Sequence, residues 1–173
     1  FRFASFGRGA NFRFMRMYQP VYFGGTRYRS DTIFANVYSD RDVYFNEATF
    51  EGSASFESCE FQRGATFENS EFRGPASFGT TRVIGNLNLS RVVFRGTVNV
   101  KEVELGSLDA LGTHFHDDAW FMDASIGGRA RFSLDEVSRH AVREDLAGLL
   151  RLEALYRDGG IWVDSDVECY RSF

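Results

Sequence analysis

The sequence is poor in cysteine and proline, with two of each among its 173 residues. Cys59 and Cys169 lie too far apart to indicate a disulfide framework or a cysteine-rich metal cluster. This usage favours a reducing compartment, and we expect a cytoplasmic location. No apolar run approaches the ~20 residues that a membrane-spanning helix needs, so we expect no membrane span. The chain also lacks an initiator methionine, and we expect it to be a piece of a longer protein.

Lysine is nearly absent, since Lys101 is the single lysine among 20 basic residues. We interpret this bias as a property of the source genome. Residues 1–30 contain six arginines and no acidic residue, whereas the rest of the chain carries 14 basic and 24 acidic residues. Arginines interleaved with tyrosine and phenylalanine can form a surface that binds phosphate or RNA. Ordinary exposed positions explain them as well; we favour that interpretation and do not expect nucleic acid as a partner.

Phenylalanine, by contrast, is abundant, with 19 residues against two tryptophans. From Phe45 to Phe78 a large apolar residue returns at alternating intervals of five and six positions, so the repeating unit has eleven residues. A small residue stands two positions before each. The pairs are Ala48 with Phe50, Ala54 with Phe56, Cys59 with Phe61, Ala65 with Phe67, Ser70 with Phe72, and Ala76 with Phe78. The pattern fits neither an amphipathic helix nor an isolated strand, and repetition at a fixed period indicates a solenoid.

The spacing also predicts the geometry of one coil. Residues two apart in an extended chain point to the same side, so each small residue and its phenylalanine would both face inward. The polar residues between them suit a wet outer face and a corner. A chain that turns after each short extended stretch winds into a β-helix, in which each coil contacts only its neighbours. We expect an interior of stacked phenylalanine rings, with Cys59 buried among the small residues.

The segments ATF at 48–50, SASF at 53–56, GATF at 64–67 and PASF at 75–78 resemble the pentapeptide-repeat family, in its branch centred on phenylalanine. The resemblance implies an all-β solenoid, a right-handed four-sided β-helix, over residues 1–132. We expect residues 13–42 to form distorted or decorated coils, and residues 80–88 to form a wider corner or a small loop. The other predicted inward centres are Phe6, Phe12, Phe23, Phe34, Leu89, Phe94, Val100, Leu105, Phe115, Phe121, Ile126 and Phe132.

One cluster of possible metal ligands lies inside this region. His114, His116, Asp117 and Asp118 are close in sequence, and two histidines can chelate a metal. Phe115 between the histidines is a predicted inward centre, however, so both histidines would point outward with no third ligand placed by the sequence. We therefore favour a plain exposed face over a metal site.

The pattern changes at residue 133, and we predict a second unit over residues 133–173. Ser133 and Glu136 form a capping-box signature, and the apolar residues that follow recur at helical intervals. Gly159 and Gly160 end the predicted helix, and a short buried strand at 161–163 leads to two aspartates. We expect the helix to cover the open end of the solenoid, because an uncovered end exposes unpaired backbone.

Residues 147–168 resemble the sugar-donor region of DXD glycosyltransferases. Arg151, Leu155, Gly159, Gly160, Asp164 and Asp166 match the family's spacing. The resemblance implies that Asp164 contacts donor hydroxyls, that Asp166 with Asp164 holds Mn²⁺ or Mg²⁺, and that Arg151 contacts the sugar or phosphates of a nucleotide sugar. Such a metal neutralises the leaving diphosphate as a Lewis acid. No catalytic residue is assigned.

Two departures argue against activity of this chain. The family's acidic residue three before the arginine falls on Gly148, with Asp145 one turn earlier as a partial substitute. The remaining halves of a donor and acceptor site also have no counterpart in the sequence. One hypothesis is therefore a fragment of a bacterial glycosyltransferase, fused to a pentapeptide-repeat scaffold and inactive in isolation. The alternative is a non-enzymatic interaction module that binds protein or mimics DNA, for which a protein partner of a solenoid face is expected.

Overall fold

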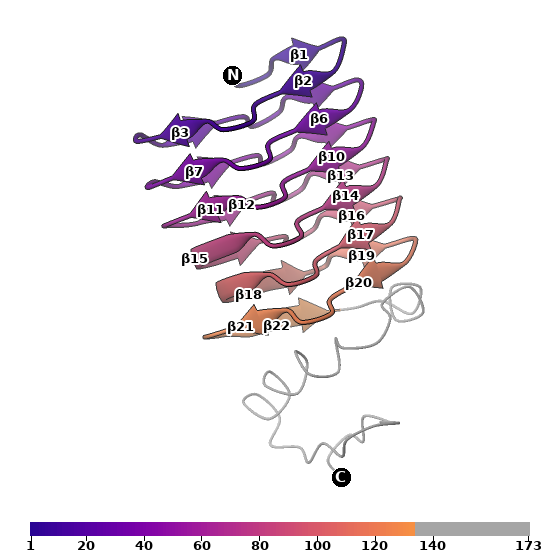
Figure 1. Ribbon diagram of the computed structural model, residues 1–173. Coiled ribbons are helices and arrows are strands. Elements are labelled where there is room, and N and C mark those ends of the chain that lie inside the picture. The colour runs from indigo at the N-terminus through magenta and orange to yellow at the C-terminus, as the bar shows by residue number, and fades with distance from the viewer. Residues whose placement is uncertain (134–173) are drawn as a thin grey trace.

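The computed structural model describes residues 1–133, which form a parallel β-solenoid of six coils without a helix in that part of the chain (Figure 1). Each coil has four sides, and we name the outer surfaces faces A to D in the order in which the chain visits them. The predicted all-β, four-sided solenoid is confirmed. The helix and the short strand predicted for residues 134–173 lie outside the described residues. So does the predicted covering of the open solenoid end by that helix.

Faces A and B are two six-stranded sheets of two-residue strands. Face A contains β1 (Ser5–Phe6), β5 (Arg27–Tyr28), β9 (Thr49–Phe50), β13 (Glu71–Phe72), β16 (Val93–Phe94) and β19 (His114–Phe115). Face B contains β2 (Ala10–Asn11), β6 (Thr32–Ile33), β10 (Ala54–Ser55), β14 (Ala76–Ser77), β17 (Val98–Asn99) and β20 (Ala119–Trp120).

Faces C and D belong to one sheet, because two long strands run across both of them. Face C contains β3 (Arg16–Met17), β7 (Tyr38–Ser39), β11 (Glu60–Phe61) and β21 (Ser125–Ile126). Face D contains β4 (Val21–Tyr22), β8 (Val43–Tyr44), β12 (Ala65–Thr66) and β22 (Ala130–Ser133). The long strands are β15 (Arg82–Asn88) and β18 (Glu104–Leu111), which pair with face C strands at one end and face D strands at the other.

The register repeats every 22 residues, which is two of the eleven-residue units. Ser5 pairs with Arg27, and Arg27 pairs in turn with Thr49. The fifth coil is one residue shorter, so Val93 pairs with His114, and the shift is absorbed by a bulge beyond Val83 in β15. Because each strand bonds to the strand one coil away, sequence separation alone fixes which side chains lie above one another.

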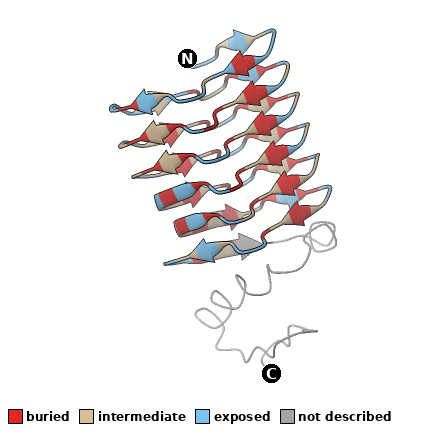
Figure 2. Cartoon of the chain, in the orientation of Figure 1, coloured by how far each residue is buried: buried red, intermediate tan, exposed pale blue. Residues whose placement is uncertain are grey.

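The interior is filled by columns of stacked rings, as the repeat predicted. On face A, Tyr28 stacks on Phe50 and Phe50 on Phe72, with ring centroids 4.7 and 4.5 Å apart. Rings of neighbouring columns meet edge to face, as do Phe45 and Phe56 at 5.3 Å. The inward residue of almost every strand is buried and its neighbour is exposed or half-buried (Figure 2).

Corners of one kind repeat every eleven residues along the backbone. A residue with positive φ, such as Glu47 at 59°, stands at the third position of a turn in which the Ala48 N–H bonds to the Phe45 carbonyl at 3.1 Å. This is the arrangement of a type II turn. The residue after the positive φ points inward, and where it is Ser70 its hydroxyl donates to the Phe45 carbonyl at 2.7 Å. Small or hydroxyl-bearing residues are favoured there because little space remains beside the rings.

Cys59 occupies one of these small inward positions and is buried, as predicted. Burial raises the pKa of its thiol to about 12. Its sulfur lies 2.8 Å from the Phe34 carbonyl oxygen. Cys59 is therefore part of the packing of the core.

Two local predictions were wrong. Residues 13–42 form regular coils rather than distorted ones, because Met17, Tyr28 and Ser39 take the inward places that phenylalanine holds elsewhere. Residues 80–88 are not a loop, since they contain the continuous strand β15. Its glycine, Gly85, passes so close to the neighbouring coil that a Cβ atom would lie 1.6 Å from the Arg63 carbonyl oxygen. The missing side chain lets the strand run directly from face C to face D.

Candidate binding faces of the solenoid

The site residues predicted from the sequence are not tested by this structure. Arg151, Gly159, Gly160, Asp164 and Asp166 all lie outside the described residues, so the donor site and its metal stay predictions. The candidate sites of residues 1–133 are instead on the outer faces.

The histidine cluster is exposed, as predicted. His114 and His116 are both exposed on face A and flank the buried Phe115. No group of three or more histidine, cysteine, aspartate or glutamate side chains within the described range is placed to hold a metal ion. The same part of the chain contains no helix long and apolar enough to cross a membrane.

The six arginines of residues 1–30 are all exposed, which both interpretations of them expect. They are divided among several faces. Arg27 and Arg29 belong to face A, Arg16 lies 6.0 Å from the Tyr38 ring on face C, and Arg2 lies 4.9 Å from the Tyr22 ring on face D. The tyrosine rings thus serve as supports for arginine side chains one coil earlier.

Face A carries a ladder of ion pairs that links successive coils. Arg27 bonds to Glu51 at 2.5 Å, and Glu71 accepts hydrogen bonds from Arg95 at 2.5 Å and from Arg73 at 2.9 Å. The hydrogen bonds from Arg95 and then Arg73 hold the pKa of Glu71 below its usual range. Each exposed pair adds little to stability, but the shared carboxylate fixes the two guanidinium groups relative to each other.

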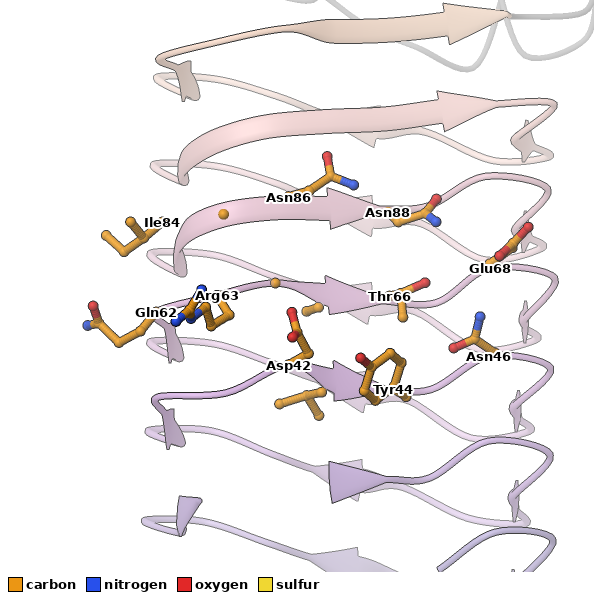
Figure 3. Close-up of a pocket in the computed structure, with 14 residues that line it drawn as sticks. Asp42, Tyr44, Asn46, Gln62, Arg63, Thr66, Glu68, Ile84, Asn86 and Asn88 are labelled. Carbon is orange, nitrogen blue, oxygen red and sulfur yellow. The ribbon is translucent and has the colours of Figure 1, made fainter. Parts of the chain in front are cut away.

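Face D contains a shallow hollow of about 670 Å³ where the outward side chains become small (Figure 3). One column of outward residues runs Tyr22, Tyr44, Thr66 and Asn88, so the aromatic rings end at Tyr44. Gly64 and Gly85 at the neighbouring corner provide no side chains either. The hollow is therefore a gap in the side-chain columns, since the backbone ladder beneath it is continuous.

Polar side chains from three consecutive coils line the hollow. Figure 3 shows Asp42 and Tyr44 on one coil, Arg63 and Thr66 on the next, and Asn86 beyond them. The Asn86 side chain is held in place, because its amide nitrogen donates to Asp109 at 3.3 Å and its oxygen accepts from Ser107 at 2.8 Å.

Tyr44 forms one end of the hollow as a fixed aromatic wall. Its ring stacks on Tyr22 with centroids 4.7 Å apart and planes 5° from parallel. Partial burial, and then the nearby Asp42 carboxylate, raise the pKa of the Tyr44 hydroxyl, so that it stays protonated at neutral pH. The phenol can therefore donate a hydrogen bond as well as accept one.

The inward repeat does not predict this hollow, because its lining residues look unrelated along the chain. Asp42, Gly64 and Asn86 are spaced by the 22-residue coil, as are Tyr44, Thr66 and Asn88. The signal that would have found it is this coil period applied to outward positions. The inward repeat alone does not reveal it.

Comparison with known families supports the repeat. Residues 40–82 match the family model for pentapeptide repeats (9 copies), a stretch that contains the Phe45–Phe78 repeat. The parallel register continues on both sides of that stretch. Searches of curated proteins and of solved structures each gave no match. The reported match does not reach residues 145–168, so the glycosyltransferase resemblance is left without support from these comparisons.

Proposed function

We propose that the pentapeptide-repeat solenoid is a non-enzymatic interaction scaffold that binds a protein partner through its outer faces. The observation that carries this proposal is the ion-pair ladder of face A, in which Glu71 holds Arg73 and Arg95 in fixed positions. Side chains that are ordered before binding lose less entropy when a partner docks, which favours recognition.

The composition of face A also suits a protein partner. Val93 is half-buried on face A and pairs with Glu71, the residue that binds Arg73 and Arg95. Arginine near apolar surface is typical of protein interfaces. Beneath face A, the stacked ring columns of the interior give the face a rigid support, because packed aromatic interiors deform little. A rigid flat face with fixed charges selects a partner by complementary charge.

An interaction module that binds protein fits the charges of face A better than one that mimics DNA. A DNA mimic presents closely spaced negative charge, whereas Arg27, Arg73 and Arg95 interrupt the acidic residues of face A. We therefore expect no inhibition of DNA gyrase supercoiling by the purified chain at micromolar concentration. Inhibition at that concentration would favour the DNA-mimic form instead.

A photo-crosslinking experiment tests the partner on face A. A photoreactive amino acid is placed at Val93 on face A or at Ser55 on face B, and the crosslinked proteins are compared after irradiation in the source cells. We expect a defined product from position 93 that is lost when Arg73 and Arg95 are both replaced by glutamate. The same products from both positions, or none from either, would contradict the proposal.

A second candidate function comes from the sequence alone. The spacing of Arg151, Gly159, Gly160, Asp164 and Asp166 supports descent from a metal-dependent glycosyltransferase that takes a nucleotide sugar with Mn²⁺ or Mg²⁺. In this interpretation the solenoid is a scaffold attached to a partial transferase segment. Calorimetric titration with Mn²⁺ and nucleotide sugars tests it.

A further inference from the structure

The hollow on face D contains charged groups that the protein leaves without partners. Arg27, Arg73, Arg82, Arg91 and Arg95 each form an ion pair on the solenoid surface. Within the described side chains, neither the Arg63 guanidinium nor the Asp42 carboxylate has a hydrogen-bond or ion-pair partner, and both line the hollow. Their bonding capacity is available to a ligand that occupies this space.

A third polar group at the same place is also unpaired. The Oγ1 atom of Thr66 is covered by its surroundings and has no hydrogen-bond partner. A covered hydroxyl without a partner costs about 1–3 kcal/mol in general. This hydroxyl belongs to a residue that lines the hollow.

The aromatic wall adds an apolar contact of defined orientation. Tyr44 is held by stacking on Tyr22, and Tyr22 is held in turn by the Arg2 guanidinium at 4.9 Å. Tyrosine combines a rigid apolar ring with a polar hydroxyl, so it contacts ligands that have both apolar and hydroxyl-rich sides. A pyranose ring is such a ligand, since its C–H groups cover one side and its hydroxyls lie around the edge.

The charges of the hollow argue against an ionic ligand. Asp42 and Arg63 balance each other, and Glu68 at the rim is neutralised by its ion pair with Arg91. A phosphate or an acidic peptide would meet Asp42, and a basic peptide would meet Arg63. Strand addition by a peptide is also disfavoured, because β8, β12 and β15 are already paired on both edges.

We propose that the hollow on face D is a binding site for an uncharged oligosaccharide. Asp42, Arg63 and the floor amide of Asn86 supply hydrogen bonds to its hydroxyls, and Tyr44 packs against one sugar ring. The volume of about 670 Å³ lies within the usual range of small-molecule sites. Coils about 4.8 Å apart place successive side-chain rows close to one pyranose residue apart. The inference goes beyond the proposed protein-binding function, because it names a different class of ligand for another face.

Calorimetric titration of the full chain with neutral hexasaccharides tests this site. The probes are linear hexamers of α-1,4-glucose, β-1,4-glucose, β-1,4-mannose and β-1,4-N-acetylglucosamine. We expect saturable binding of at least one of them, weakened about tenfold or more by Tyr44→Ala and by Arg63→Ala. Tyr38→Ala removes a tyrosine from face C of the same coil and is expected to leave binding unchanged.

A filling variant keeps the test independent of any loss of stability. Thr66→Tyr extends the column of Tyr22 and Tyr44 by one coil, so it blocks the hollow with a ring that stacks on the existing column. We expect it to abolish binding while the far-ultraviolet circular dichroism and the melting temperature are kept. Absence of binding by every hexasaccharide, binding that Thr66→Tyr does not change, or binding of a mixed hexapeptide library in place of sugars would overturn the proposal. Because the crosslinking experiment uses face A, failure on face D is distinguishable from failure of the scaffold function.

Discussion

The ring of Tyr28 stacks on the ring of Phe50, with centroids 4.7 Å apart and planes 3° from parallel. Tyr28 thus takes the same place in the face A column as Phe6, Phe50 and Phe72. Its hydroxyl, unlike theirs, brings a polar group into the core, where it is fully covered and has no hydrogen-bond partner in the described part of the chain. Desolvation by this burial raises the pKa of the phenol well above its ordinary value.

Tyr28→Phe is therefore expected to stabilise the protein. The change removes an unpaired buried hydroxyl and keeps the ring stack, so the free energy of unfolding should rise by about 1 kcal/mol or more. Urea denaturation followed by circular dichroism measures the difference. Tyr38→Phe, at an outward position of face C, is the control and should change stability by less than about 0.5 kcal/mol. A fall in stability for Tyr28→Phe would show that the hydroxyl has a partner.

Glu47→Gly is expected to stabilise a turn. Glu47 is exposed and has a φ of 59°, a conformation that costs a residue with a Cβ about 1–2 kcal/mol. Glycine removes this strain but loses more entropy on folding, so we expect a net gain of about 0.5–1 kcal/mol. Asn46→Gly, one residue earlier in the same turn and outside the positive φ region, is the control and should give no gain. Equal effects of the two changes in thermal unfolding would contradict the prediction.

Gly85→Ala is expected to be strongly destabilising. The added Cβ would lie 1.6 Å from the Arg63 carbonyl oxygen, which is backbone of the neighbouring coil. The coils must separate locally to admit the methyl group, at a cost of at least about 2 kcal/mol. Gly7→Ala is the matched control, because nothing lies within 4 Å of its added Cβ. Similar midpoints of urea unfolding for the two variants would show that the coils are not packed this closely.

The Glu71 ion pairs are expected to make stability depend on pH in the acidic range. The pKa of Glu71 is lower in the folded protein than its ordinary value of 4.5, so the folded state binds this proton less readily than the unfolded state. The stabilisation is therefore present above pH 4.5 and is lost as the pH falls through the folded pKa. Because the carboxylate is half-buried and its arginine partners are exposed, solvent screens the pairs and we expect less than about 1 kcal/mol.

Glu71→Gln measures this contribution. The wild-type protein should unfold at higher urea concentration than the variant at pH 7, and the difference should diminish as the pH falls below 4.5. It should also shrink at 1 M salt, since exposed pairs are screened. A difference that stays constant from pH 7 to pH 3 would mean that the ion pairs do not cause it.

Titration with Mn²⁺ and a panel of UDP- and GDP-sugars tests the predicted donor site. If Arg151, Asp164 and Asp166 form a working site, heat will be released only with the metal and will vanish when both aspartates are replaced by alanine. Because Gly148 replaces the expected acid, we expect no saturable binding by this chain. Metal-dependent binding would contradict that expectation and restore the enzyme as the first candidate.

The inward half of the molecule follows from the sequence by itself. The eleven-residue recurrence from Phe45 to Phe78 predicted the coil, its ring columns and the burial of Cys59. This is possible because the interior admits only apolar or small side chains, so every inward position carries the same requirement. Where Met17, Tyr28 and Ser39 replaced phenylalanine the repeat became hard to see, although the backbone register did not change.

The outward half was decided by the tertiary structure. Contact between Arg95 and Glu71, or between Tyr22 and Tyr44, depends on the 22-residue register of the coil. Outward residues face water, which accepts nearly any side chain, so no periodic signal marks them in the sequence. The ion-pair ladder and the hollow of face D therefore appear only when the coils are stacked.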